Sequence, residues 1–162
     1  MITFLITVFA GITSLVIASF IGLIGIAYYI WQSLEFYWLF KMCDYRHAWM
    51  AWIPVLNYYA LAEGTGDGMG QTRLYLVNTD IATDIFRFWP ILTLAVSRME
   101  GVGGILELLL TILCLGTSFT TVYSKFENRS PDEVKILGYL SGWIPLIGVI
   151  RLTQYRHRQM FY

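Results

Sequence analysis

Charge is the scarcest property of this 162-residue chain. Only 14% of its residues are Asp, Glu, Lys or Arg, against about 25% in a typical soluble domain. Eleven basic and eleven acidic residues leave a formal net charge of zero. A nucleic-acid-binding protein normally presents a basic surface, so we expect no nucleic-acid partner. The low charge instead favours a membrane protein.

Cysteine and histidine are also sparse. Cys43 and Cys114 lie far apart in the chain, and the two histidines are His47 and His157. Two distant cysteines predict no disulfide framework. Cys43 and His47 would share a helix face at their i, i+4 spacing, but two ligands do not make a zinc site. No serine–histidine–acid set stands out, so we expect no enzymatic activity, no metal and no cofactor.

Basic residues are absent from the first forty positions, which include an apolar run of about 30 residues. A cleavable signal peptide has a basic start and a shorter apolar core. The run is therefore predicted to be a retained first span over residues 3–30, longer than the ~20 residues that a membrane helix needs. Its small residues either let helices approach closely in lipid or are ordinary for a membrane helix; they are Ala10, Gly11, Ala18, Gly22, Gly25 and Ala27.

Apolar residues make up 57% of the chain, aromatic residues 17%, and the mean hydropathy is +0.59. This composition predicts an all-α, polytopic integral membrane protein with two to four transmembrane helices and additional proline-broken interfacial or re-entrant helices. We expect one membrane domain, residues 1–162. Its predicted segments are a first span (3–30), an aromatic interfacial helix with a first proline segment (31–62), a polar loop (63–84), a short apolar segment with a long span (85–122), a second proline segment (130–152) and a basic tail (153–162).

Two short segments repeat the same three letters. "AWIPVLNYYAL" covers residues 51–61 and "GWIPLIGVI" covers residues 142–150. A proline inside a helix removes a hydrogen bond, and in lipid the freed backbone groups need other partners. Paired broken helices line the sites of many transporters. The segments therefore mark either a polar site around Pro54, Asn57, Pro145 and Gly148 or two interfacial bends.

Tryptophan and other aromatic residues concentrate near these segments. Such residues are enriched at the headgroup depth of a bilayer. We assign an interfacial belt to Trp38, Trp49, Trp52 and Trp143.

Glu107 is the most unusual single charge, because it lies inside the apolar run "GILELLLTIL". An intramembrane acid is by default a functional hypothesis with a partner to be named, and Arg98 and Arg87 are the candidates. Glu107 is a proton or cation relay, a member of a structural ion pair or subunit contact, or a hydrated group near the interface.

Two polar stretches carry local signals. Ser130, Pro131 and Glu133 fit the N-cap, N1 and N3 positions of a capping box, which predicts a helix start. "GTGDGMG", residues 64–70, superficially matches a phosphate loop, but such loops follow a strand. We expect a flexible external loop, with weak cation binding through Glu63 and Asp67 as the alternative. Asp80 and Asp84 would share a face if their segment is helical.

The stretch "LFKMCDYRHAWMAWIPVLNYYAL" resembles a family of small, uncharacterised bacterial membrane proteins. The family pattern has a basic, a small and a glycine residue, then tryptophan, then "A-x-I-P-φ-Y-N-x-Y-x-L". The matching residues are Lys41, Cys43, Trp49, Ala51, Ile53, Pro54, Asn57, Tyr59 and Leu61. Asp44 replaces the family's glycine and Leu56 its usual tyrosine. The later "SKFENRSPDEVKILGYLSGWIPLIG" is similar to the family's "K-x-F-G-K-S-P" turn and proline-containing span.

The resemblance implies architecture and membrane location, not chemistry. The same module precedes the catalytic region of some type I signal peptidases. Since no peptidase region follows here, the resemblance does not extend to a serine–lysine mechanism.

Positive charges near the span ends predict orientation. Lys41 and Arg46 follow the first span, which predicts an external N-terminus. Further basic residues place the polar turn and the tail on the cytoplasmic side of a bacterial inner membrane; they are Lys125, Arg129, Lys135, Arg151, Arg156 and Arg158. Residues 136–150 would then enter and return without crossing, or lie along the surface.

These observations favour a non-enzymatic scaffold or accessory subunit. Its expected partners are the lipid bilayer and either further copies of itself or other membrane subunits. The alternative is a small transporter or channel built on Asn57, Glu107 and the two broken segments.

Overall fold

The computed structural model describes residues 2–64 and 70–159, with side chains from residue 11 to 64 and from 70 to 158. The predicted loop 64–70, including Asp67, lies almost wholly outside the described residues. The chain forms two compact units, Met1–Gln32 and Ser33–Tyr162. The expected single membrane domain stays a prediction.

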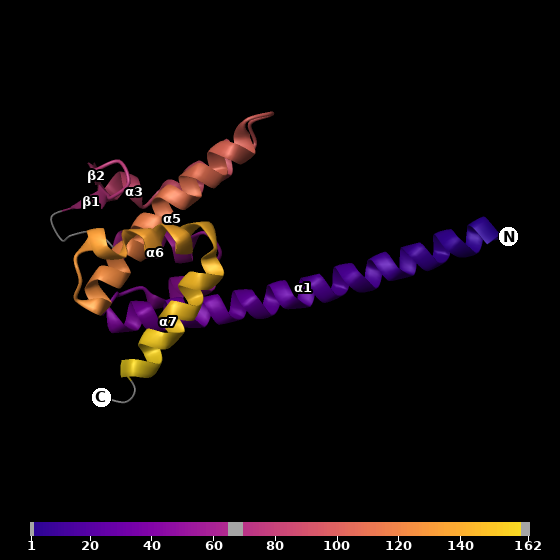
Figure 1. Ribbon diagram of the computed structural model, residues 1–162, viewed down its shortest axis with the longest axis horizontal. Helices are drawn as coiled ribbons and strands as arrows, with labels where there is room; N and C mark the ends of the chain where they lie inside the picture. The colour runs from indigo at the N-terminus through magenta and orange to yellow at the C-terminus, as the bar shows by residue number, and fades with distance from the viewer. Residues whose placement is uncertain (1, 65–69, 160–162) are drawn as a thin grey trace. The chain divides into compact units, whose positions relative to one another are not determined.

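Helix α1, Ile2–Met42, supplies all of the first unit (Figure 1). From residue 11 to residue 27 every side chain is exposed, including Ile12 at 58% and Leu15 at 69%. A helix that is apolar on all sides is stable in hydrocarbon rather than in water. The segment Gly11–Met42 is long and apolar enough to cross a membrane, in agreement with the predicted first span.

Helix α1 continues past residue 30, where the predicted first span ends. Residues 31–42 continue α1 rather than forming a separate interfacial helix, because no proline or glycine interrupts the helix there. The helix ends where Asp44 adopts a φ of 51° and the Tyr45 N–H donates to the Phe40 carbonyl. This is the Schellman arrangement, whose left-handed residue is usually glycine.

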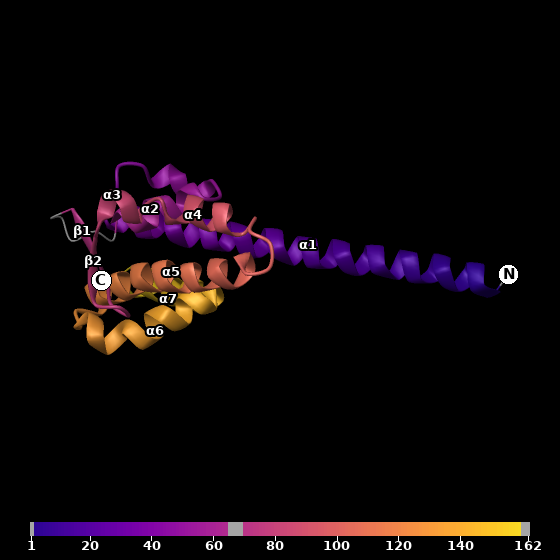
Figure 2. The same cartoon turned by 90° about the horizontal axis from the view of Figure 1, so that it is seen from above.

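The second unit holds the remaining elements. They are η1 Ala48–Trp52, α2 Leu56–Gly64, β1 Gln71–Leu74, β2 Thr79–Ala82, α3 Thr83–Phe86, α4 Trp89–Val96, α5 Gly103–Glu127, α6 Pro131–Trp143 and α7 Pro145–Gln159. Figure 2 shows α2, α3 and α4 on one side of α5 and α6 on the other. The core between them is apolar and aromatic; it includes Phe36, Leu39, Leu61, Leu115, Phe119 and Tyr123.

Residues 63–84 contain a β-hairpin that the sequence analysis missed. Strands β1 and β2 pair antiparallel, with Gln71 opposite Ala82 and Leu74 opposite Thr79. Asp80 lies in β2 and Asp84 in α3, so the condition for a shared helix face, a helical segment over both residues, is not met. The strands have only four residues each, too few for alternation to predict them against a polar loop.

Helix α5 is the second helix long and apolar enough to cross a membrane. Its 25 residues correspond to about 37 Å at ~1.5 Å per residue. The predicted span ends at residue 122, but the helix continues to Glu127, where Asn128 adopts a left-handed φ of 51°. Helix α4, with eight residues, is too short to cross alone. The described residues thus contain two candidate spans, the lower end of the predicted range.

The start of α6 agrees with the sequence prediction. Ser130 is the N-cap residue and Pro131 the first helical residue. The Ser130 hydroxyl donates to the Glu133 carboxylate, at 2.9 Å, rather than capping a backbone N–H. Arg129 also bonds this carboxylate, at 3.0 Å. These hydrogen bonds hold the pKa of Glu133 below its ordinary value, that from Arg129 having the largest effect.

Close helix packing joins α5 to α6 through small residues. Gly138 and Gly142 lie one helical turn apart on α6, and a Cβ atom on Gly142 would stand 2.6 Å from the backbone nitrogen of Gly116 on α5. The Tyr123 hydroxyl and the Ser141 hydroxyl share a hydrogen bond of 2.7 Å in the same interface. Small-residue contacts of this kind are typical of membrane helix pairs. The sequence pattern did not predict that α5 and α6 pack together.

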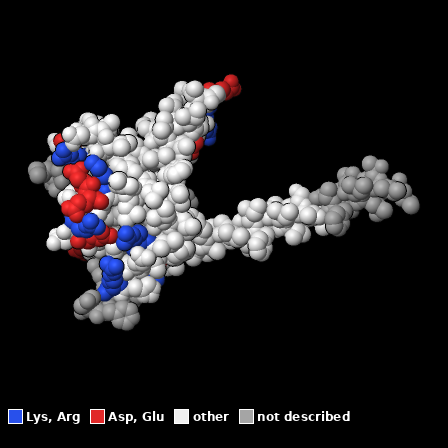
Figure 3. Space-filling model, viewed as in Figure 1, with Lys and Arg blue, Asp and Glu red and all other residues white. Residues whose placement is uncertain are grey.

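Charged side chains have a restricted distribution on the face shown in Figure 3. Most gather at the end of the second unit where the hairpin, the start of α6 and the end of α7 lie (Figures 1 and 3). A second, smaller group lies at the connection between α4 and α5, where Arg98 and Glu100 are exposed. Charged residues therefore lie near both ends of α5, and Glu107 is the charged residue between them on this helix.

Candidate functional site

The two proline segments are bends between helices. Ile53 follows η1 with φ −110° and ψ 121°, and Ile144 follows α6 with φ −119° and ψ 87°. The Ile53 carbonyl accepts the N–H of Asn57, and the Ile144 carbonyl accepts the N–H of Ile147, each at 3.0 Å. These two carbonyls are thus satisfied by the N–H groups of the following helices.

Neither proline lies inside a helix. Pro145 is the first residue of α7, a position whose N–H needs no intrahelical partner, and Pro54 lies before α2. Because these prolines interrupt no regular helix, the expected loss of an interior hydrogen bond is wrong. The bends separate α6 from α7 and η1 from α2.

The residues three positions after the prolines have different environments. Asn57 is 2% exposed, and its Oδ1 accepts the N–H of Tyr58 at 2.7 Å. Gly148 lies against the Phe119 ring, which a Cβ atom would strike. Position 57 thus holds a buried polar amide, whereas position 148 leaves room for an aromatic ring. The two segments are therefore alike in their bends, but not in the environments of Asn57 and Gly148.

Glu107 does not pair with either candidate arginine. Arg87 forms ion pairs with Glu63 at 3.3 Å and with Asp84 at 3.1 Å, whereas Arg98 is exposed at the α4–α5 connection. Within residues 11–64 and 70–158, no ion pair or hydrogen bond of the Glu107 side chain is observed. Glu107 is half-buried, on the second turn of α5.

A buried ion pair that the sequence analysis missed joins α1 to α7. Glu35 is 1% exposed, and its Oε1 lies 3.1 Å from Nη1 of Arg156, whose side chain is 22% exposed. Neither Glu35 oxygen has a hydrogen bond of good geometry to any described residue. The one signal for Glu35 in the sequence was its position next to the aromatic Phe36, on a helix that continues past residue 30. Because residues 31–50 were interpreted as interfacial, Glu35 was not predicted to be buried.

Glu127 forms a second charged centre at the end of α5. Its carboxylate lies 3.4 Å from Arg151 and 3.5 Å from Arg129, and it accepts a hydrogen bond of 2.6 Å from the Tyr155 hydroxyl. Burial and this hydrogen bond raise the pKa of Tyr155 above its ordinary value. The centre ties α5 to α7 and to the loop that starts α6.

Glu63 forms a third centre at the end of α2. It accepts a hydrogen bond from the Tyr45 hydroxyl and pairs with Arg87, whose guanidinium lies 5.6 Å from the centre of the Tyr59 ring. Burial, followed by the bond to Glu63, raises the pKa of Tyr45 above its ordinary value. Glu63, half of the alternative cation site, is therefore already engaged by a phenol and an arginine.

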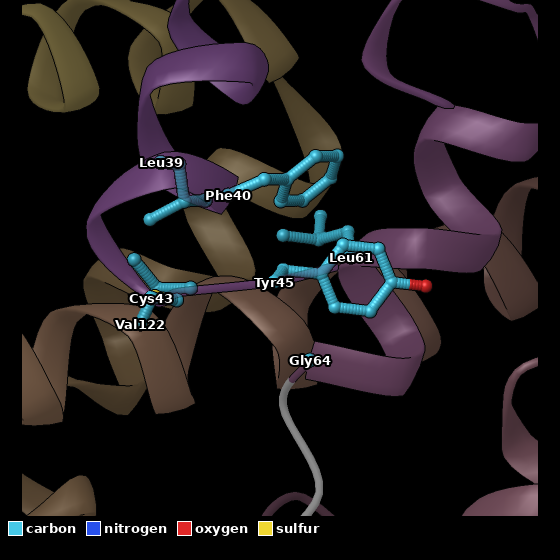
Figure 4. A pocket seen from close by; sticks show the side chains of 7 residues that line it. All are labelled: Leu39, Phe40, Cys43, Tyr45, Leu61, Gly64 and Val122. Atoms are coloured by element: carbon cyan, nitrogen blue, oxygen red, sulfur yellow. The ribbon is translucent and has the colours of Figure 1, made fainter. Parts of the chain in front are cut away.

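Cys43 and His47 do not share a helix face, because α1 ends at Met42. Cys43 lines a small apolar cavity of about 20 Å³ with Leu39, Phe40 and Val122, while the Tyr45 hydroxyl points away from it (Figure 4). Desolvation raises the pKa of the Cys43 thiol, only partly offset by Lys125. A thiol acts as a nucleophile in its ionised form, so this environment does not activate it. No group of three or more His, Cys, Asp or Glu residues that could hold a metal occurs in the described parts of the chain.

The four tryptophans of the predicted belt are exposed. Trp38 and Trp52 are each 43% exposed, Trp49 52% and Trp143 59%. Exposed indoles are suited to headgroup contacts, and the interfacial belt stays a prediction.

Comparison with known proteins adds no relative: no family model, no curated protein and no solved structure matches this chain.

Proposed function

We propose that this protein is a non-enzymatic membrane scaffold or accessory subunit that self-associates through α1. The observation that carries the proposal is that every side chain from residue 11 to residue 27 is exposed, on a helix with the composition of a membrane span. In a bilayer such a surface contacts lipid or another helix. Contact with another helix is favoured when one face of the helix has a shape that the partner helix can match.

Small residues supply that face. Gly11, Ser14, Ala18, Gly22 and Gly25 fall within about 80° of the helix circumference at ~100° per residue. A Cβ atom added at any of the three glycines would meet nothing within 4 Å. Small faces allow two backbones to approach closely in lipid. A second copy of the chain supplies a matching face, as in a two-fold symmetric dimer.

The proposed location is a bacterial inner membrane with the N-terminus outside. Lys41 lies in the last turn of α1 and Lys125 in the last turn of α5. Basic residues at the C-terminal ends of both spans favour the cytoplasmic side for those ends. This orientation requires the chain between α1 and α5, which includes α3 and α4, to return to the outer side of the membrane. The basic residues of α7, Arg156 and Arg158, support a cytoplasmic C-terminus.

Self-association predicts that Ala18→Ile weakens the dimer at least tenfold, because the added side chain separates the two small faces. Ala27→Ile is the matched control: both residues are exposed alanines of α1, and they lie about 180° apart at ~100° per residue. Energy transfer between labelled copies in vesicles, measured across protein-to-lipid ratios, gives the affinity. Equal weakening by both variants, or a monomeric parent protein, would exclude this interface.

A second candidate function, a small transporter or channel, is favoured by the buried amide of Asn57 and by Glu107 on a candidate span. This candidate predicts that Glu107→Gln abolishes proton or cation flux into reconstituted vesicles. Glu100→Gln, which changes an exposed acid at the α4–α5 connection, is the control. Parent-level flux in the Glu107 variant, or no flux in the parent protein, rejects conduction through Glu107.

A further inference from the structure

A polar cavity of about 130 Å³ lies between the hairpin and the start of α6. Its walls come from Arg73, Tyr75, Asn78, Pro131 and Asp132. All of these side chains except that of Pro131 can form hydrogen bonds. A single water molecule needs about 10–15 Å³, so the cavity has room for a polar group of several non-hydrogen atoms.

Two opposite charges line the cavity without forming an ion pair with each other. Arg73 pairs with none of the acids that the structure describes, and its guanidinium donates a hydrogen bond to Oδ1 of Asn78. Asp132 pairs with Lys135 at 3.0 Å through Oδ1. Because this pair is exposed, it is weak, and a guanidinium and a carboxylate can each form several hydrogen bonds. A ligand with one anionic and one cationic group would match both charges.

The cavity lies at headgroup depth in the proposed membrane orientation. The Tyr75 hydroxyl shares a hydrogen bond of 3.3 Å with the hydroxyl of Thr121, close to the end of the candidate span α5 at Glu127. The hairpin and the start of α6 also lie at the end of the second unit where charged side chains gather (Figures 1 and 3). Phospholipid headgroups, which carry a phosphate and in some lipids a cation, are present at this depth.

We propose that this cavity binds the phosphoethanolamine headgroup of phosphatidylethanolamine. Arg73 and the amide of Asn78 donate hydrogen bonds to the phosphate, since a guanidinium suits bidentate contact with phosphate oxygens. Asp132 accepts a hydrogen bond from the ammonium, which has N–H donors that the choline group of phosphatidylcholine lacks. A headgroup with a phosphate but no cation would satisfy Arg73 and bring negative charge towards Asp132.

Lipid retention tests the headgroup preference. The protein is reconstituted in vesicles with equal amounts of phosphatidylethanolamine and phosphatidylcholine of identical acyl chains, and is then extracted in mild detergent. Mass spectrometry quantifies the lipids that stay bound. We expect at least fivefold more phosphatidylethanolamine than phosphatidylcholine on the parent protein. Equal retention of the two lipids would overturn the proposal.

Asp132→Asn tests the contact with the ammonium. This variant should retain the two lipids in nearly equal amounts, because its amide carries no charge. Asp84→Asn is the matched control: Asp84 is 83% exposed and pairs with Arg87 three positions later, as Asp132, 82% exposed, pairs with Lys135. Asp84 does not line the cavity. A parent-level preference in Asp132→Asn, or equal losses in both variants, would overturn the contact.

Arg73→Gln tests the contact with the phosphate. It should lower the retained phosphatidylethanolamine at least fivefold, because charge-assisted hydrogen bonds to the phosphate are lost. Arg98→Gln, at an exposed position of the α4–α5 connection, is the control and should retain the parent level. Equal retention by these two variants would show that Arg73 does not bind the headgroup.

Titration calorimetry in detergent separates the lipid from a soluble source of the same headgroup. Short-chain phosphatidylethanolamine should bind at least tenfold more tightly than glycerophosphoethanolamine. Equal affinities would overturn the membrane lipid as the source, and binding of neither ligand would overturn the site itself. Self-association through α1 is measured separately, so failure of either proposal leaves the other intact.

Discussion

Gly142→Ala is expected to destabilise the second unit by about 2 kcal/mol. A Cβ atom at this position would stand 2.6 Å from the Gly116 nitrogen, 2.8 Å from its Cα and 2.9 Å from the Ile112 carbonyl oxygen. All three are backbone atoms of α5, so no side-chain rotation relieves the clash. Overpacking of this kind costs up to about 3 kcal/mol, whereas alanine gains about 1 kcal/mol over glycine in helix propensity.

Denaturation in mixed detergent micelles, followed by helical circular dichroism, measures this change. Gly104→Ala is the matched control on α5, because a Cβ atom there meets nothing within 4 Å; it should be neutral or slightly stabilising. Gly138→Ala should behave like Gly142→Ala, since its Cβ would stand 2.7 Å from the Thr120 nitrogen. Equal stability of Gly142→Ala and Gly104→Ala would contradict the close approach of α5 and α6.

Arg156→Met is expected to cost about 3–5 kcal/mol, the usual penalty for breaking a buried ion pair by removing one partner. Glu35 is 1% exposed and would remain in the core without a cation. Glu35→Gln should cost less, about 1–2 kcal/mol, because the Arg156 side chain is already 22% exposed and its head can reach water. The unequal cost follows from the unequal burial of the two groups.

A double-mutant cycle measures this pair directly. The variant with both Glu35→Gln and Arg156→Met should be more stable than Arg156→Met alone, because no unpaired charge is then buried. Arg158→Met, at an exposed position of the same helix turn, is the control for loss of a tail charge. Additive costs in the double variant would show that Glu35 and Arg156 do not interact energetically.

The sequence alone predicted the helical architecture, both candidate spans and the start of α6. These features depend on local composition: apolar runs of about 20 residues predict spans, and Ser130 before Pro131 marks a helix start. Boundaries were less certain, because residues 31–42 carry aromatic and charged side chains that suit a headgroup layer. Their helix continues from the first span nonetheless, since nothing in them interrupts it.

The candidate site depended far more on tertiary structure. The sequence identified Glu107 and its neighbouring arginines, yet Arg87 pairs with Glu63, 24 positions away. Glu35 pairs with Arg156 across more than a hundred residues, a distance that no local pattern covers. Hydrophobic periodicity specifies which face of a helix is buried, not which charge on another helix lies opposite.

The sequence and the packing of the helices determined different features of this protein. The residues by themselves determined that the chain is helical, apolar enough for a membrane and bent at two prolines. Only the tertiary structure decided that Gly138 and Gly142 meet α5, and that Glu35 lies against Arg156. Helix formation and insertion depend on neighbouring residues, whereas these contacts depend on the register and rotation of helices that are distant in the chain.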